Sequence, residues 1–457
     1  MRRLFLVTIE SLLLLMIGLA ATYVLLGRAA SYQFFSDGGW IKVALVALML
    51  QLAFYLFDLY DLRATRSYRR VVTNLAMALG AATVLLSILF YAVPVLELGR
   101  GILFVNIALV AALIPAWRLM VAWSQGHPQL GVRERVMILG SGEQAIEIAR
   151  ATLERRNAGF HIVGFVDNKP ELLGKSLINP SVIGVTDDIG LLVERYQVDR
   201  IVVAVEDRRG QFPTEELLNL TLSGRVAVEE CVRYYERLTG KIASEMLRPS
   251  WLIFSRRSRY SDIAHHVRRV INVGIAALGF TLSLPVMILT AIAVKLDSRG
   301  PIFYTQERVG KNGRQFKIIK FRSMRVGAET GSGPVWAEAS DPRVTRVGRI
   351  IRKLRLDELP QFINVLRGDM NFVGPRPERP VFVEQLRNII PYYSQRHLIK
   401  PGLTGWAQIK YPYGASVEDA IEKLRYDLYY IKNQSFLLDA VILFETIKTV
   451  LFGRGGR

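Results

Sequence analysis

Two adjacent carboxylates, Asp357 and Glu358, stand in a chain segment that is dense with arginine. On a helix their side chains would point about 100° apart, which suits two different roles at one site better than one shared proton. One carboxylate can attack phosphorus while the other holds Mg²⁺, an ion that prefers carboxylate and phosphate oxygens. A structural role is compatible with this chemistry. Asp357 could be a helix N-cap with Pro360 in the first turn, and a helix N-terminus favours bound phosphate.

Basic residues elsewhere in the same half of the chain are candidates for binding phosphate. Arg376 lies between Pro375 and Pro377, so its guanidinium is rigidly presented and can bind phosphate oxygens in a bidentate manner. The further candidates are Lys320, Arg322, Arg352 and Arg355. A single residue of this kind is more often a solvated surface charge or an ion-pair partner. Together with the two carboxylates, the set predicts a site for a phosphorylated substrate.

The composition excludes several classes of protein. Of the 457 residues 51% are hydrophobic, which is more apolar side chain than a disordered tail or a collagen-like fibre carries. Cys231 is the only cysteine, so an intrachain disulfide or a cysteine-rich metal site cannot form, and no HExxH motif of zinc hydrolases occurs. Residues 241–457 contain 35 Lys and Arg against 18 Asp and Glu. This basic half could face phosphates, nucleic acid or an anionic membrane leaflet.

Residues 1–125 predict a four-helix transmembrane bundle. Four apolar runs are each close to the roughly 20 residues that a spanning helix needs. They are Leu4 to Leu26, Val43 to Leu59, Val71 to Val95 and Ile102 to Trp123. Arginines cluster before the first run, between the second and third, and after the fourth: Arg2, Arg3, Arg63, Arg66, Arg69, Arg70, Arg133 and Arg135. The positive-inside rule therefore places both ends of the bundle in the cytoplasm.

Residues 133–235 predict a small parallel α/β domain of the Rossmann type. Short β-branched runs alternate with helical stretches: Val136 to Leu139, His161 to Val166, Ile201 to Val205 and Val226 to Glu230. The first run leads into a GxGxxA turn with Gly140 and Gly142, and Asp167 ends the second run. In a dinucleotide-binding fold such glycines approach a pyrophosphate and the acid binds a ribose hydroxyl. A structural turn, in a domain that serves assembly, would leave the same pattern.

A fifth long apolar run, residues 270–294, follows a predicted linker at 236–265. Basic residues flank it on both sides: Arg268 and Arg269 before it, Lys295 and Arg299 after it. The positive-inside rule favours keeping both flanks in the cytoplasm, and Pro285 near the middle removes a backbone hydrogen bond and can bend a helix. The sequence therefore predicts a re-entrant helical hairpin that enters and leaves the membrane on one face. A fifth spanning helix with a proline kink is the alternative.

The remaining residues predict an α+β module. Asn312-Gly313 is a strong turn signal between Pro301 to Arg308 and Arg314 to Arg322, which predicts a β-hairpin. Residues Phe436 to Phe452 predict an apolar helix that lies either in the membrane interface or against the core. The predicted fold class is thus a membrane helical bundle, an α/β Rossmann-like domain and an α+β module with a re-entrant hairpin.

Six motifs of the basic half resemble one known family. They are Lys295 to Phe303, Gln306 to Gly310, Lys320 to Met324, the Asp-Glu-Leu-Pro-Gln box from Asp357, Gly374 to Glu378, and Lys400 to Gln408. In this order and spacing they look like the bacterial sugar transferases. That family comprises the polyprenyl-phosphate hexose-1-phosphate transferases, also called monotopic phosphoglycosyl transferases. The resemblance covers residues 266–457, which would be the catalytic domain. The upstream part is similar to the large members, which place four transmembrane helices and a Rossmann-like domain before that module.

The resemblance implies a two-step reaction at the cytoplasmic face of the bacterial inner membrane, the first membrane step of exopolysaccharide, capsule or O-antigen synthesis. Asp357 would attack the β-phosphorus of a UDP-sugar, release UMP and form an aspartyl-phosphosugar intermediate. Polyprenyl (undecaprenyl) phosphate would then accept the phosphosugar. Glu358 would bind Mg²⁺, and the basic residues named above would hold phosphates. The family's hairpin typically breaks at a Ser-Pro pair, whereas Leu284 separates Ser283 from Pro285 here.

Other interpretations compete with this one. A membrane-anchored nucleotide-sugar dehydratase also joins four spans to a Rossmann domain, but it needs a Tyr-xxx-Lys pair, and none of the 18 tyrosines has a lysine four residues on. A non-catalytic scaffold of polysaccharide assembly would be a degenerate module, yet Asp357, Glu358 and Arg376 are all present. Nucleic-acid binding is not expected, because the basic residues are interleaved with membrane-seeking segments. The expected partners are a UDP-sugar, polyprenyl phosphate, anionic membrane lipid and a second copy of the chain. The identity of the sugar stays open.

Overall fold

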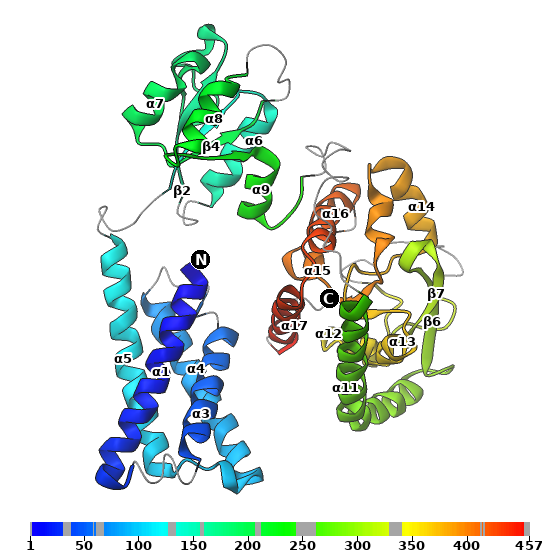
Figure 1. The fold of residues 1–457 in the computed structure, drawn as a ribbon. Helices are drawn as coiled ribbons and strands as arrows, with labels where there is room; N and C mark the ends of the chain where they lie inside the picture. The colour runs from blue at the N-terminus through cyan, green and yellow to red at the C-terminus, as the bar shows by residue number, and fades with distance from the viewer. Residues whose placement is uncertain are drawn as a thin grey trace. The chain divides into compact units, whose positions relative to one another are not determined.

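The computed structural model describes residues 2–30, 38–57, 59–60, 68–126, 134–155, 160–205, 212–243, 262–328, 341–411, 414 and 416–451. Arg63, Arg66 and Arg133, and residues 244–261 of the predicted linker, lie outside the described residues. The chain divides into two compact units, Met1–Arg135 with Arg155–His161, and Val136–Glu154 with Ile162–Arg457. Figure 1 shows the elements in chain order from blue to red.

The first unit contains four long apolar helices, drawn blue to cyan in Figure 1: α1 (Arg2–Leu26), α3 (Gly39–Leu56), α4 (Tyr68–Ala92) and α5 (Arg100–Gly126). All four are long and apolar enough to cross a membrane. Helices α1 and α4 each contact α3 and α5, so the four close around one core that includes Leu14, Leu50 and Leu86. Leu48 and Phe104 point outward, 65% and 75% exposed, as helices surrounded by lipid require. The predicted apolar helices are confirmed.

A five-stranded sheet forms the α/β domain, most of which belongs to the second unit. Its elements in chain order are β1 (Glu134–Leu139), α6 (Glu143–Glu154), β2 (Phe160–Asp167), β3 (Val182–Val185), α7 (Ile189–Tyr196), β4 (Arg200–Val203), α8 (Thr214–Leu222), β5 (Ala227–Glu230) and α9 (Cys231–Thr239). The strand order is β3-β2-β1-β4-β5, and the pairs β1–β4, β4–β5 and β2–β3 are parallel. The predicted parallel α/β domain is confirmed. The additional strand β3 is short and contains Gly184, which weakens its sequence signal.

The rest of the second unit, green to red in Figure 1, combines one long helix with short strands and helices. They are α11 (Asp262–Asp297), β6 (Phe303–Val309), β7 (Gln315–Phe321), α12 (Arg346–Lys353), the 3-10 helix η9 (Leu356–Gln361), α13 (Phe362–Arg367), β8 (Asn371–Val373), α14 (Pro380–Ile389), the 3-10 helix η10 (Tyr393–Leu398), β9 (Gly402–Thr404), α15 (Trp406–Lys410), α16 (Val417–Lys432) and α17 (Phe436–Leu451). Strands β6 and β7 pair antiparallel, which confirms the predicted hairpin. Its turn holds Asn312 and Gly313 at φ 56° and 79°, the left-handed conformation that such a turn requires.

Helix α11 contains the fifth apolar run and is bent in Figure 1. Pro285 lies inside it, where no backbone N–H is available for the helical hydrogen bond. Gly279 comes close to α13, because a Cβ atom there would lie 3.1 Å from the Phe362 ring. Two apolar clusters join the helix to β7, with Ala276 in one and Met287 in the other. The bent helix thus packs against the β6–β7 hairpin and against the Asp-Glu-Leu-Pro-Gln box.

Helix α9 and the residue after it bond the α/β domain to α15 and α16. Both carboxylate oxygens of Glu236 accept hydrogen bonds from α16 and its C-cap, one from Lys432 Nζ and one from Asn433 Nδ2, each at 2.6 Å. Trp406 Nε1 donates to the Gly240 carbonyl at 2.8 Å. Residues 236–239 of the predicted linker therefore belong to α9, and residues 236–243 pack against α15 and α16.

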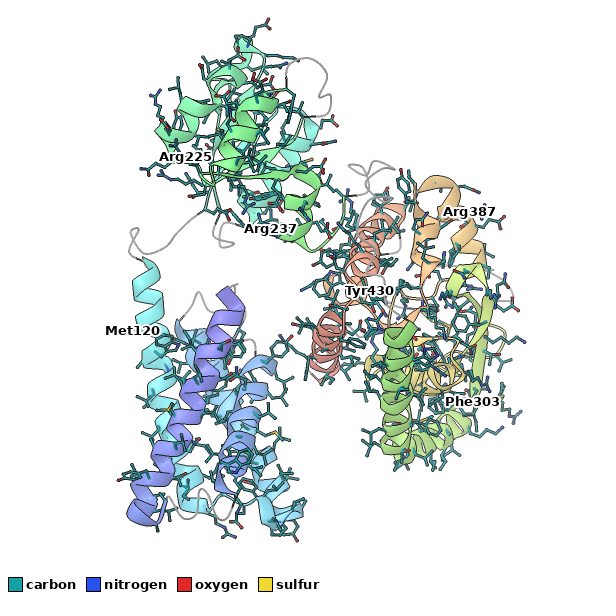
Figure 2. The ribbon with its side chains drawn as sticks, viewed as in Figure 1. Met120, Arg225, Arg237, Phe303, Arg387 and Tyr430 are labelled. Atoms are coloured by element: carbon teal, nitrogen blue, oxygen red, sulfur yellow. The ribbon has the colours of Figure 1, made fainter. Side chains whose placement is uncertain are left out.

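Helix α17 packs one face against the core. Ile442 is fully buried in a cluster with Val373 and Tyr430, the latter labelled in Figure 2. Leu437 on another face is 76% exposed. Core packing, one of the two placements predicted for this helix, accounts for its buried face.

Candidate active site

The Asp-Glu-Leu-Pro-Gln box forms η9, which runs directly into α13. Arg355 precedes η9 in the left-handed conformation, with φ 60°, which is uncommon for a residue that has a side chain. This turn starts the helix at Leu356, so Asp357 lies inside η9 and the prediction that Asp357 is the N-cap is wrong. The three-residue repeat of a 3-10 helix points the side chains of Asp357 and Glu358 about 120° apart.

Apolar packing and one asparagine hold the box in place. Leu356 and Leu359 pack in the cluster formed with the bent helix α11. Asn364, fully buried on α13, donates from Nδ2 to the Lys317 carbonyl at 2.8 Å and accepts from the Ile319 N–H at 3.1 Å. These two bonds fix β7 beside the box, so that a side chain from the strand can reach the carboxylates.

Glu358 faces three cations. Its Oε1 lies 3.0 Å from Lys320 Nζ and 3.1 Å from Arg376 Nη2, and its Oε2 lies 3.7 Å from Arg355 Nη1. Burial by itself would raise the pKa of Glu358, but these cations together hold that pKa well below its ordinary value. Glu358 is therefore ionised at neutral pH, and its charge raises the pKa of Arg376.

Asp357 behaves in the opposite way. The residue is 8% exposed, and burial raises its pKa above the ordinary value, with the neighbouring Glu358 charge adding to the rise and Lys320 opposing it. Adjacent carboxyl groups whose surroundings move their pKa values apart can take different chemical roles. Asp357 is the more basic carboxylate of the two, and Glu358 is the permanent anion.

Both carboxylates line one cavity of about 890 Å³. Every predicted phosphate-binding residue lines it as well: Lys320, Arg322, Arg352, Arg355 and Arg376. The volume is within the range of pockets that bind small-molecule ligands. The structure thus brings together seven side chains that lie between positions 320 and 376 of the sequence.

Arg322 also bonds to the C-terminal end of α11. Its Nη2 donates to the Ser298 carbonyl at 2.7 Å, to Ser298 Oγ at 2.9 Å and to the Val294 carbonyl at 3.4 Å. Carbonyls in the last turn of a helix have no partner within the helix, so a guanidinium there is stabilising. The side chain therefore joins the cavity wall to the C-terminal end of α11.

The cavity also contains charged residues that the sequence analysis missed, including Arg308, Arg396 and Asp427. Arg396 Nη2 pairs with Asp427 Oδ2 at 2.9 Å, and their side chains are 6% and 2% exposed. Burial raises the pKa of Asp427 to about 6, although the charge of Arg396 opposes this. One signal was available: Asp427 interrupts the buried face of α16, next to Leu424 and Leu428.

The predicted nucleotide-binding residues lie in the α/β domain. Gly140 has φ 112°, and a Cβ atom there would lie 2.8 Å from the Ala204 carbonyl oxygen, so glycine is required for the close approach of this turn to the end of β4. Asp167 is buried and accepts a hydrogen bond from the Lys169 N–H at 3.1 Å. Gly140, Gly142 and Asp167 are not among the described residues that line the cavity.

Comparison with known proteins decides the family. The family model described as Bacterial sugar transferase matches residues 263–453. A UDP-galactose-lipid carrier transferase from Erwinia amylovora is 32% identical over 371 residues, which cover 78% of this chain and 76% of that protein. The chain belongs to the bacterial sugar transferase family.

Two further relatives match this sugar transferase over a smaller share of their own length. A UDP-N-acetylgalactosamine-undecaprenyl-phosphate N-acetylgalactosaminephosphotransferase from Aeromonas hydrophila is 41% identical over 270 residues, 59% of this chain and 62% of that protein. An undecaprenyl-phosphate glucose phosphotransferase from Komagataeibacter xylinus is 32% identical over 333 residues, 70% of this chain and 59% of that protein. The sugar transferase thus spans about three fifths of the length of these two relatives. A second family model, described as CoA-binding domain, matches residues 55–210.

Proposed function

We propose that this sugar transferase moves a sugar 1-phosphate from a UDP-sugar to polyprenyl phosphate, giving a polyprenyl-diphosphate-linked sugar and UMP. The observation that carries the proposal is the pair Asp357 and Glu358, which lie in one basic cavity and have pKa values shifted in opposite directions. The names of the relatives support a lipid phosphate as acceptor. Those names differ in the sugar, so the donor is a question for experiment.

The positions of the charged groups support a displacement in two steps. In the first step an Asp357 oxygen bonds to the β-phosphorus of the donor, the bond from that phosphorus to the bridging oxygen breaks, and UMP leaves. In the second step an acceptor phosphate oxygen bonds to the same phosphorus and the Asp357 carboxylate is released. The raised pKa makes ionised Asp357 the stronger nucleophile of the pair. Lys320, Arg352 and Arg376 line the same cavity and neutralise the charge of the transferring group.

The same cavity fits a magnesium ion that is shared with the substrate. Among the described residues, no group of three or more acidic, histidine or cysteine side chains could hold a metal ion. Mg²⁺ in phosphoryl-transfer sites is commonly bound by one or two carboxylates together with substrate phosphates and water. Glu358 would supply the protein ligand, and the ion would neutralise diphosphate charge.

For the membrane helix we propose the re-entrant placement, with the cavity on the cytoplasmic side of the bacterial inner membrane. The bend of α11, Pro285 within it and the basic residues on both flanks support this placement. A Cys231→Ser chain carrying a single cysteine at His266 or at Leu296 would test it with a membrane-impermeant maleimide on oriented vesicles. Both cysteines should react from the cytoplasmic side. Reaction from opposite sides would show a spanning helix instead.

The activity is tested with the purified full chain, Mg²⁺, undecaprenyl phosphate and a panel of UDP-N-acetylgalactosamine, UDP-glucose and UDP-galactose. Wild type should release UMP with one donor, and Asp357→Asn should reduce that release at least ~1,000-fold because it removes the nucleophile. Glu384→Gln, at an exposed position on α14 outside the cavity lining, is the matched control and should retain the wild-type rate. No UMP with any donor from a folded wild-type sample would overturn the proposal.

A further inference from the structure

The main chain that carries Arg376 is held by its carbonyl groups. Pro375 and Pro377 have no N–H, so this segment offers few donors of its own. Four consecutive carbonyls accept hydrogen bonds: Pro375 O from Gly402 N at 2.9 Å, Arg376 O from Arg396 Nη2 at 3.1 Å, Pro377 O from Arg308 Nη1 at 3.2 Å, and Glu378 O from Val309 N at 3.0 Å. Residues 375–378 are thus fixed at every carbonyl.

Two of these four donors are arginine side chains that other groups orient. Arg396, 6% exposed, also donates from Nη1 to the Tyr393 hydroxyl at 2.7 Å and from Nη2 to Asp427 at 2.9 Å. Arg308, with its side chain 18% exposed, donates from Nη2 to Gln306 Oε1 at 2.7 Å, and its Nη1 lies 3.7 Å from the Glu378 carboxylate. Contacts with other side chains therefore fix the orientation of each guanidinium that donates to a carbonyl of this segment.

Stability alone is a weak reason for such an arrangement. A buried ion pair loses much of its attraction to the cost of removing both charges from water, and apolar residues of similar volume often serve as well. A planar guanidinium, however, can bond an anchor and a carbonyl at the same time in fixed directions. The element that both arginines share is the segment that presents Arg376.

We infer that Arg308 and Arg396 are positioning residues for the phosphoryl transfer. Arg396 fixes the carbonyl of Arg376, and Arg308 fixes the carbonyl of Pro377. Together they hold the Arg376 guanidinium in the cavity, where its Nη2 lies 3.1 Å from Glu358 Oε1. This inference rests on the proposed function. It requires neither arginine to touch the substrate, and a misplacement of about 1 Å in such a group is enough to slow a reaction substantially.

Lysine substitutions test the inference without removing a charge. A lysine carries its three donors on one nitrogen and lacks the planar fork that reaches Tyr393, Asp427 and the carbonyl together, so Arg396→Lys should slow UMP release about 10- to 100-fold. Arg308→Lys should act in the same direction. Arg425→Lys is the matched control: Arg425 lies on α16, has the same 18% side-chain exposure as Arg308 and pairs with Glu422 at 3.0 Å. It does not line the cavity and should leave the rate unchanged.

A double-mutant cycle separates positioning from general structural support. If Arg396 acts through Arg376, then Arg396→Lys should cost less than threefold in an Arg376→Ala background, because the group it positions is gone. Single-turnover UMP release in wild type, both single variants and the double variant gives the cycle. Losses that multiply in the double variant would overturn the inference while leaving the proposed function intact.

A second measurement does not depend on activity. Hydrogen exchange of the peptides that contain Val309 and Gly402 reports on the bonds those N–H groups make to Glu378 and Pro375. The N–H groups of Val309 and Gly402 should both exchange faster in Arg396→Lys. Their exchange rates should be unchanged in Arg425→Lys. If wild type proves inactive with every donor, the proposed function fails. Unchanged exchange in Arg396→Lys would then overturn the positioning inference separately.

Discussion

Two arginine–glutamate pairs of equal length lie in different surroundings. Arg225 Nη1 is 3.1 Å from Glu194 Oε1 in the α/β domain, and Arg376 Nη2 is 3.1 Å from Glu358 Oε1 in the cavity. The side chains of Arg225, labelled in Figure 2, and Glu194 are 67% and 69% exposed, whereas those of Arg376 and Glu358 are 42% and 13% exposed. Water screens the first pair, so it contributes about 0–1 kcal/mol. In the second pair the Glu358 carboxylate is largely buried and also faces Lys320, so water screens its charge less.

The same contrast separates the two domains as wholes. Among the described residues, four charged side chains that line the cavity are less than a tenth exposed: Arg322, Asp357, Arg396 and Asp427. In the α/β domain the buried charged residues Asp167 and Glu236 accept hydrogen bonds from a turn and from α16 with its C-cap. Buried charge is costly and concentrates where a site requires it. The part of this sugar transferase that surrounds the cavity is therefore the part in which buried charges gather around one site.

Removing the arginine from each pair should give the largest difference. Arg376→Ala should slow UMP release about 100- to 1,000-fold, because in the proposed reaction this cation would stabilise the transferring phosphoryl group. Arg225→Ala should keep the wild-type rate and change the free energy of unfolding by less than ~0.5 kcal/mol. Initial rates and urea unfolding of the two variants side by side provide the measurement. Similar losses in both would mean that burial does not distinguish the pairs.

Neutralising Glu358, the carboxylate of the cavity pair, should move the pH dependence of the rate. In wild type the rate should fall as pH decreases through the raised pKa of Asp357, because the protonated carboxyl is no nucleophile. Glu358→Gln removes a like charge that raises this pKa and leaves Lys320 and Arg376, which lower it. The acid limb of the residual rate should therefore move to lower pH. Glu384→Gln should leave the limb in place, and a shift to higher pH in Glu358→Gln would contradict the assignment.

Local patterns predicted the elements and the composition of the site. The Asn-Gly turn predicted the hairpin, the apolar runs predicted the long helices, and the cluster of motifs between Lys320 and Arg376 supplied residues that do share a cavity. These signals are short-range, or they belong to segments that pack in sequence order. Side-chain type and spacing were sufficient for them.

Long-range partnerships were not predictable in the same way. Arg396 and Asp427 are 31 positions apart, and only the fold shows that Arg396 reaches the carbonyl of Arg376. Arg322 was predicted as a phosphate ligand, but the residues next to it in the sequence do not indicate that its Nη2 bonds to Ser298 at the end of α11. The left-handed turn at Arg355, which displaced the predicted N-cap, also has no sequence signal, because glycine is the usual residue in that conformation. Tertiary contacts decided each of these points.

The smallest effect on the rate should come from the glycine-rich turn of the α/β domain. Gly140→Ala places a Cβ atom 2.8 Å from the Ala204 carbonyl in a backbone with φ 112°, which should cost about 1–3 kcal/mol of local stability. Gly224→Ala is the matched control, because φ is 68° there and nothing lies within 4 Å of the added atom, so its cost should be smaller.

Hydrogen exchange of β1 and β4 should report the difference between the two glycine variants, since Gly140 joins β1 to α6 and Ala204 follows β4. UMP release should stay within about twofold of wild type in both, because the described residues that line the cavity lie outside this turn. A large loss of rate in Gly140→Ala, with exchange in η9 unchanged, would show that the turn acts on the reaction. Helix α9 offers a physical route for such an effect, because it packs on α6 at one side and bonds Lys432 and Asn433 through Glu236 at the other. The α/β domain would then influence the reaction through α9, although the buried charges of the cavity lie outside it.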